Sequence, residues 1–161
     1  MAEFRLCYKR GKVGYAKNHA AYILRENDYK AKEDLVFKQS GNMQFINGNN
    51  ALAFWEAADQ NEGMNRNAYR ELELNIPNEL THTQAVVLIQ KYIKKEIGND
   101  FPYSFVIHES FNDNGEKNLH CHLMFSERKI DGIDRDLERF FKKANSKKPE
   151  LGGAKKDREW K

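Results

Sequence analysis

The segment between Tyr103 and Phe125 constrains the fold of this chain more than any other part of the sequence. Two mainly apolar stretches, Tyr103–Glu109 and Leu119–Phe125, flank a polar run that contains Asn114-Gly115. Strand-like stretches on both sides of an Asn-Gly turn predict an antiparallel β-hairpin. We therefore expect a sheet that includes this hairpin.

The hairpin carries three of the five histidines of the chain. His120 and His122 are two residues apart on one strand and therefore point to the same face, and His108 ends the preceding strand. Three converging imidazoles suit a divalent metal ion and leave positions open for water or substrate oxygens. Cys121 lies between two of the histidines but points to the opposite, apolar face, so we exclude it as a ligand.

The rest of the sequence predicts an α+β fold. Further strands are expected at Phe4–Tyr8, Leu35–Phe37 and Tyr69–Ile76, and helices at 16–25, with Asn18 as N-cap, 51–61, from Thr81 to about Ile97, and 134–144; Ser40–Asn50 is expected to be a loop. We expect a central antiparallel β-sheet with helices packed on one face. The 161 residues fit a single domain, 1–161, with a basic C-terminal segment from about residue 139.

The strand Tyr69–Ile76 alternates strictly and places two carboxylates on one face. Leu72 and Leu74 are expected to face the helices, so Glu71 and Glu73 share the open face of the sheet. A glutamate near the histidine hairpin can accept an N–H from a ligating imidazole and so orient it. Two ordinary surface glutamates are the alternative interpretation.

A metal site of this kind would suit phosphoryl transfer to a tyrosine. Such a metal polarises a phosphate, and a tyrosine hydroxyl can attack it to form a phosphotyrosine ester that later reverses. Spacing leaves Tyr15, Tyr22 and Tyr29 as candidate nucleophiles in the polar N-terminal region, and His19 as a rival. The sequence pattern alone does not choose among them.

Charge and composition bear on the partner and the cellular compartment that we expect for this chain. The net charge is only +3, but from Arg139 to the end there are nine Lys or Arg residues against three Asp or Glu. Such a local excess can follow phosphates, although a solvated basic tail has the same composition. The sequence shows neither a signal peptide nor a run of 18 apolar residues, so we expect a soluble, intracellular protein with reduced cysteines.

The order of short motifs resembles the MobA/MobL relaxases of the HUH endonuclease superfamily. The similarity runs along essentially the whole chain, through Ala20-Ala21-Tyr22-Ile23 with Arg25-Glu26, Asp34 to Asn42, Phe54 to Asp59, Tyr69-Arg70-Glu71-Leu72-Glu73, Pro77 to Leu80, Ile107-His108, His120 to Arg128, Asp131-Gly132-Ile133 and Gly152 to Arg158. One departure is Cys121, which stands where alanine is common; a small buried thiol should be tolerated there.

The resemblance implies more than the spacing does. It implies a relaxase that nicks one strand at an origin of transfer, stays bound to the 5′ end through a tyrosine and later religates the strand. It assigns the nucleophile to Tyr22, the Mn²⁺ or Mg²⁺ ligands to His108, His120 and His122, and the active-site acids to Glu71 and Glu73. It also implies single-stranded and hairpin DNA, accessory relaxosome proteins and a coupling protein as partners in the bacterial cytoplasm. Arg25, Lys155, Lys156 and Arg158 are our candidates for DNA contacts.

Three alternatives remain open. One is another HUH enzyme, a replication initiator or transposase, which would use the same site on different DNA. Another is a non-catalytic DNA-binding protein with a structural metal. A third is a metallohydrolase that forms no covalent adduct.

Overall fold

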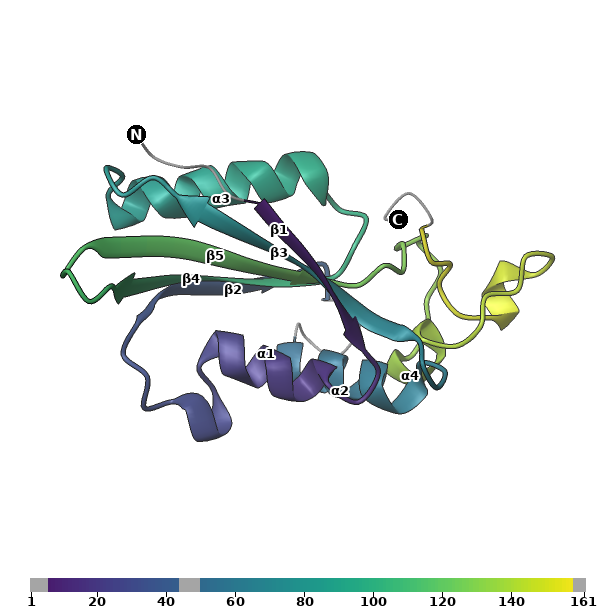
Figure 1. The fold of residues 1–161 in the computed structure, drawn as a ribbon. Helices are drawn as coiled ribbons and strands as arrows, with labels where there is room; N and C mark the ends of the chain where they lie inside the picture. Colours follow the sequence, from purple (N-terminus) through teal and green to yellow (C-terminus); the bar gives the residue numbers. More distant parts are fainter. Residues whose placement is uncertain (1–5, 44–49, 158–161) are drawn as a thin grey trace.

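The computed structural model describes residues 6–43 and 50–157, which build one five-stranded sheet with helices against it (Figure 1). All strand pairs are antiparallel, in the order β1-β3-β5-β4-β2. The strands are β1 (Leu6–Lys12), β2 (Leu35–Gly41), β3 (Asn67–Ile76), β4 (Tyr103–Phe111) and β5 (Lys117–Phe125), and the helices are α1 (Ala16–Leu24), α2 (Ala51–Asn61), α3 (His82–Glu96) and α4 (Leu137–Phe140), with 3₁₀ turns at Asn27–Tyr29 and Pro149–Leu151. The predicted α+β class and antiparallel sheet are confirmed.

The predicted hairpin forms the centre of the sheet. β4 pairs with β5 from Tyr103–Phe125 to Phe111–Lys117, and His108 lies directly opposite His120. Asn112 accepts backbone N–H groups from Asn114 and Glu116 through its side-chain oxygen, and Gly115 takes a positive φ of 76°. These bonds close a tight turn, so both strands are two residues longer at the turn than the sequence indicated.

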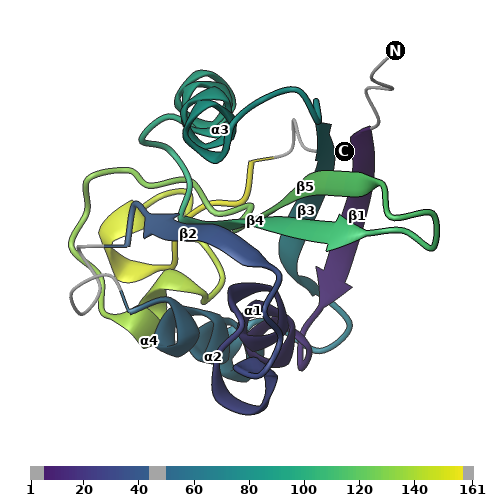
Figure 2. The same cartoon turned by 90° about the vertical axis from the view of Figure 1, so that its left-hand side faces the viewer.

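Helices cover both faces of the sheet, and the expectation that they pack on one face is wrong (Figure 2). Helix α3 packs on the face that carries Leu119, Cys121 and Leu123. Helices α1, α2 and α4 pack on the histidine face, where Val106 and Met124 are buried beside them. Because central strands with apolar residues on both faces must be covered on both sides, one helical layer cannot complete the core.

The sequence predicted the start of one helix correctly and the starts or ends of two others wrongly. Thr81 caps α3 with a capping box closed by Gln84, as its position predicted. Helix α1 starts after Tyr15, so Asn18 is inside the helix and is not the cap. The helix expected at 134–144 is wrong in its bounds, because α4 covers only Leu137–Phe140. Past this point the returning chain binds the carbonyls: the Ala154 N–H donates to Phe140 and the Gly153 N–H to Lys143.

Each edge strand carries a glycine that lies under a tyrosine ring of its neighbour. Gly11 of β1 pairs with Tyr69, and Gly41 of β2 pairs with Tyr103. A Cβ on Gly11 would stand 1.9 Å from the Tyr69 ring, and one on Gly41 would stand 2.4 Å from the Tyr103 hydroxyl. The absent side chains are what allow both rings to lie flat across the sheet edges.

A buried ion cluster joins the C-terminal segment to the sheet. Glu62 pairs with both Arg128 and Lys156, and Arg128 also donates to the carbonyls of Lys142 and Ala154 at 2.8 and 2.5 Å. These contacts satisfy several backbone groups of the returning chain at once.

In the part of the chain that the structure describes, no helix has the length and apolar character needed to cross a membrane.

Candidate active site

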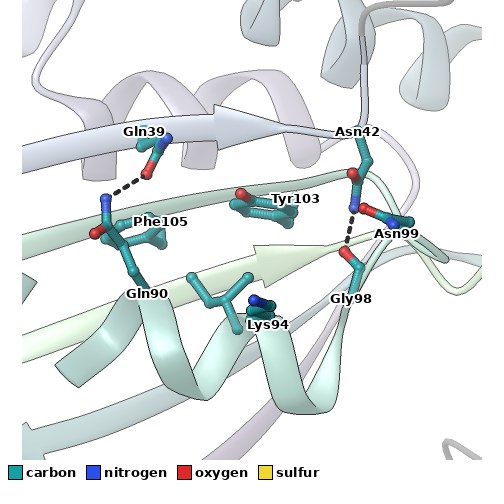
Figure 3. Close-up of a pocket in the computed structure, with 9 residues that line it drawn as sticks. Gln39, Asn42, Gln90, Lys94, Gly98, Asn99, Tyr103 and Phe105 are labelled. Carbon is teal, nitrogen blue, oxygen red and sulfur yellow. Dashed lines mark hydrogen bonds between the residues drawn. The ribbon is translucent and has the colours of Figure 1, made fainter. Parts of the chain in front are cut away.

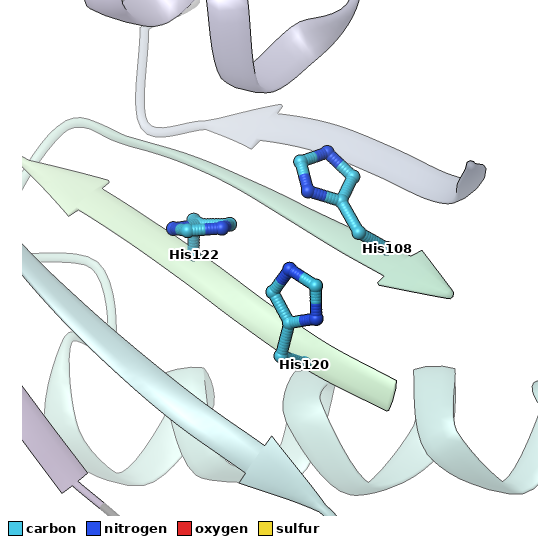
Figure 4. A group of neighbouring side chains, drawn as sticks. All are labelled: His108, His120 and His122. Atoms are coloured by element: carbon cyan, nitrogen blue, oxygen red, sulfur yellow. The ribbon is translucent and has the colours of Figure 1, made fainter. Parts of the chain in front are cut away.

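The three histidines of the hairpin converge on one face of β4 and β5 (Figure 4). The ring centroids lie 5.4 Å apart for His108 and His120, 5.2 Å for His108 and His122, and 5.1 Å for His120 and His122. One nitrogen can be chosen from each ring so that all three nitrogens lie within 4.8 Å of one another. The strand alternation therefore brings together the residues that it was expected to bring together.

The chemistry of these rings fits a divalent metal ion. Among the described residues, the Nδ1 atoms of His120 and His122 are buried without a hydrogen-bond partner, which is costly unless something binds them. Burial disfavours the charged imidazole and lowers the pKa of His108 to about 4, and burial also lowers the pKa of His120. Neutral imidazoles with free lone pairs are the form that binds metals.

His108 connects the cluster to the end of helix α1. Its Nε2–H donates to the Ile23 carbonyl at 2.8 Å, which leaves the lone pair on Nδ1. Arg25 ends the helix in the left-handed conformation, and its guanidinium donates to the Tyr22 carbonyl at 2.5 Å and to His108 Nδ1 at 3.4 Å. A metal ion on this nitrogen would have to replace the hydrogen bond from Arg25. Asp34 holds the guanidinium through two bonds of 2.8 Å. The last turn of α1 is thus fixed against the histidines.

Tyr22 lies in this last turn with a partly exposed ring. Its side chain is 36% exposed, and two cations flank it: the Arg25 guanidinium carbon is 4.8 Å and the Lys32 ammonium 4.9 Å from the ring centroid. Tyr29 packs edge-on against the same ring, with centroids 5.2 Å apart. Tyr15 stands at the opposite end of α1. Of the tyrosines that spacing left open, Tyr22 is the one whose ring contacts Arg25, which in turn contacts His108.

Glu71 and Glu73 lie on β3, next to β5, and their environments differ. Glu71 is 1% exposed; burial raises its pKa, but the neighbouring His122 and His19 outweigh burial and lower the pKa to about 2. Its Oε1 lies 3.5 Å from His122 Nδ1. Glu73 pairs with Lys9 at 3.0 Å and is partly exposed. The face that carries them is partly covered by α1, not open as the sequence suggested.

His19, which spacing left open as a rival nucleophile, lies beside Glu71, a contact that the sequence did not predict. Its Nε2 lies 2.7 Å from Glu71 Oε1, and its ring stacks on Tyr69 with centroids 5.1 Å apart. A signal was present, because His19 and Tyr22 are three residues apart and share a face of α1. The fifth histidine, His82, is exposed, lies at the start of α3 and contacts Glu109 at 2.6 Å.

The predicted DNA-contact residues separate into different groups. Arg25 is 7% exposed and paired with Asp34, and Lys156 is paired with Glu62, so a phosphate would have to displace a carboxylate to reach either side chain. This pairing favours positioning roles over the expected phosphate contacts. Lys155 is exposed, and Arg158 lies outside the described residues.

Comparison with known proteins identifies the family. The family model described as "MobA/MobL family" matches residues 13–161. The chain belongs to the MobA/MobL family. A 43 kDa relaxation protein of Salmonella typhimurium is 41% identical over 97% of the chain, and mobilization protein A of Escherichia coli is 36% identical over 97%. The chain spans 43% and 22% of the lengths of these two relatives.

The fold of this MobA/MobL chain also matches a solved structure. The structure described as "Molecular Basis of Vancomycin Resistance Transfer in Staphylococcus aureus" superposes with a TM-score of 0.64, over 83% of this chain and 75% of that one. The sequences are 17% identical, so this likeness concerns the fold.

Proposed function

We propose that this chain is a DNA relaxase domain that nicks a single strand at an origin of transfer and later rejoins it. The observation that carries the proposal is the contact between the three-histidine cluster and the last turn of α1, made by His108 and the Ile23 carbonyl. That turn holds Tyr22 next to the cluster. The names of the relatives, a relaxation protein and a mobilization protein, support the same activity.

Tyr22 is the proposed nucleophile. Its phenolic oxygen forms a bond to the scissile phosphorus, and the bond from phosphorus to the 3′ oxygen breaks. The phenol loses its proton, and the 3′ oxygen leaves as a hydroxyl. The 5′-phosphotyrosine ester retains the energy of the broken bond, so attack by a 3′-hydroxyl rejoins the strand without ATP. Arg25, fixed by Asp34, sets the position of the tyrosine ring.

His108, His120 and His122 are the proposed ligands of a Mn²⁺ or Mg²⁺ ion. When bound, this ion would withdraw charge from the phosphate oxygens as the phosphorus is attacked. Glu71 positions His19 through a 2.7 Å hydrogen bond, and its negative charge lies 3.5 Å from His122 Nδ1, where it attracts that ring. Glu73, paired with Lys9, adds negative charge at the edge of the same site, which favours a cation there.

A labelled single strand that contains the cognate origin tests the proposal. Incubation with Mn²⁺ followed by denaturing electrophoresis should give a protein–DNA band that EDTA prevents. Tyr22→Phe should abolish the band, whereas Tyr15→Phe and Tyr29→Phe should retain it. A band that survives in Tyr22→Phe would refute the assigned nucleophile. A protein that binds the strand and gives no adduct would match the non-catalytic alternative.

A further inference from the structure

A cavity lies on the face of the sheet opposite the histidines. It has a volume of about 500 Å³ and is formed by edge strand β2, the start of β4 and the last turns of α3 (Figure 3). Tyr103 and Phe105 line it, whereas Ser104 and Val106, which alternate with them, face the other side. The proposed nicking reaction does not use this cavity.

Two glutamines at the mouth of the cavity offer both a donor and an acceptor. Gln90 Nε2 donates to Gln39 Oε1 at 3.1 Å, and both side chains are exposed. Within the described residues, this bond leaves the Gln39 amide N–H groups and the Gln90 carbonyl oxygen without a partner. Reversing both amides exchanges the two roles but keeps one donor and one acceptor. Such a pair matches the edge of a nucleobase.

The floor of the cavity is aromatic. The rings of Tyr103 and Phe105 lie 6.3 Å apart at an angle of 26°. Tyr103 can cross the sheet edge because Gly41 has no side chain, as described above. Phe105 is fully buried, so the partly exposed Tyr103 ring is the aromatic surface beside the polar groups that a planar, partly polar ligand such as a base can reach.

The wall of the cavity supplies a cation. Lys94 lies in the last turn of α3 and is exposed. Across the described parts of the chain, the ion pairs of the lysines involve other residues and leave Lys94 unpaired. Its ammonium group is therefore available for a phosphate a short distance from the glutamine pair.

We propose that this cavity binds one unpaired nucleotide of single-stranded DNA, with the base on Gln39 and Gln90 and a neighbouring phosphate on Lys94. The inference rests on the proposed function, since that function supplies the single strand. The two sites lie on opposite faces of the sheet, because β4 carries His108 on one face and Tyr103 on the other. β2 is the edge strand that pairs with β4. A strand held at both sites would pass over the β2 edge.

Fluorescence anisotropy of a labelled oligothymidylate, measured over a range of salt concentrations, tests the phosphate contact. Lys94→Gln should reduce the slope of log affinity against log salt by about 0.7, the value expected for one phosphate on a single strand. The matched control is Lys91→Gln, which removes the same charge from an exposed position on α3 outside the cavity lining. Equal slopes for the two variants would overturn the proposal.

The base contact has its own test. The double variant Gln39→Ala with Gln90→Ala should weaken oligothymidylate binding about fivefold, since losing a pair of hydrogen bonds to a base edge reduces affinity by at least this factor. The same variant should bind an abasic strand like the unaltered protein. Equal losses on both strands would overturn the base contact.

Failure of this inference can be told apart from failure of the proposed function. If the protein still forms the covalent adduct and Lys94→Gln behaves like Lys91→Gln, only the cavity assignment is wrong. If the unaltered protein binds no single strand at any salt concentration, both proposals fail.

Discussion

The ion pair between Arg25 and Asp34 is expected to stabilise the folded protein. The Arg25 guanidinium donates to the Asp34 carboxylate, overcomes the effect of partial burial and lowers the pKa of Asp34 from 3.8 to about 2. This difference corresponds to about 2 kcal/mol of folding free energy. Asp34→Asn imitates the protonated acid, so we expect it to reduce the free energy of unfolding by about 2 kcal/mol at pH 7.

The effect of Asp34→Asn has a defined pH window. Because the folded-state pKa lies below the unfolded value, the contribution is complete above about pH 4 and is lost as the pH falls through about 2. Urea unfolding followed by circular dichroism should show a midpoint lower by about 1 M at pH 7, for a slope of about 2 kcal/mol per M. The gap between variant and unaltered protein should narrow steadily below pH 4.

A matched variant controls for the loss of one negative charge. Asp113 is exposed in the β4–β5 turn and forms no ion pair within the described residues, so Asp113→Asn should change the free energy of unfolding by no more than a few tenths of a kcal/mol. If Asp34→Asn destabilises the protein equally at pH 7 and pH 3, the loss comes from packing and the ion-pair reasoning is wrong.

Three further outcomes are expected from the same contacts. Gly11→Ala should lower the free energy of unfolding by about 1–3 kcal/mol, because its Cβ would overlap the Tyr69 ring; an unchanged thermal midpoint would contradict this. His120→Ala should weaken Mn²⁺ binding in calorimetry at least about tenfold, whereas His82→Ala should not, and equal effects would remove His120 from the site. Without added metal, the free energy of unfolding should fall as the pH drops from about 6.5 to about 4, because His108 binds a proton in the unfolded chain but resists it when buried. In urea unfolding at several pH values, His108→Gln should reduce this dependence of the free energy on pH.

The sequence predicted those parts of the fold and site that depend on strand periodicity. Alternation placed Leu123 and Cys121 on one face of β5 and His120 and His122 on the other, and the Asn-Gly turn predicted the hairpin. The convergence of the imidazoles therefore followed from local rules. The second helical layer was missed, although Met124 on the histidine side of β5 was an apolar signal for it.

Contacts between residues distant in sequence could not be predicted in this way. The bonds of His19 to Glu71 and of His108 to the Ile23 carbonyl depend on how α1 docks on the sheet, and no local period encodes that docking. The length of α4 depends on a returning chain whose Ala154 N–H takes one of its carbonyls. The nucleophile was likewise left open by spacing, and its assignment to Tyr22 remains a proposal.

The strand order β1-β3-β5-β4-β2 has a consequence for how the chain reaches this structure. Of the described strand pairings, β4–β5 alone joins strands that follow each other directly in sequence; the others close long loops. Loop closure costs less entropy for the short connection, so the folding order of lowest cost begins with this hairpin. His108, His120 and His122 all lie on it. The imidazole cluster can therefore assemble early, and α1 then brings Tyr22 to a site that the hairpin has already built.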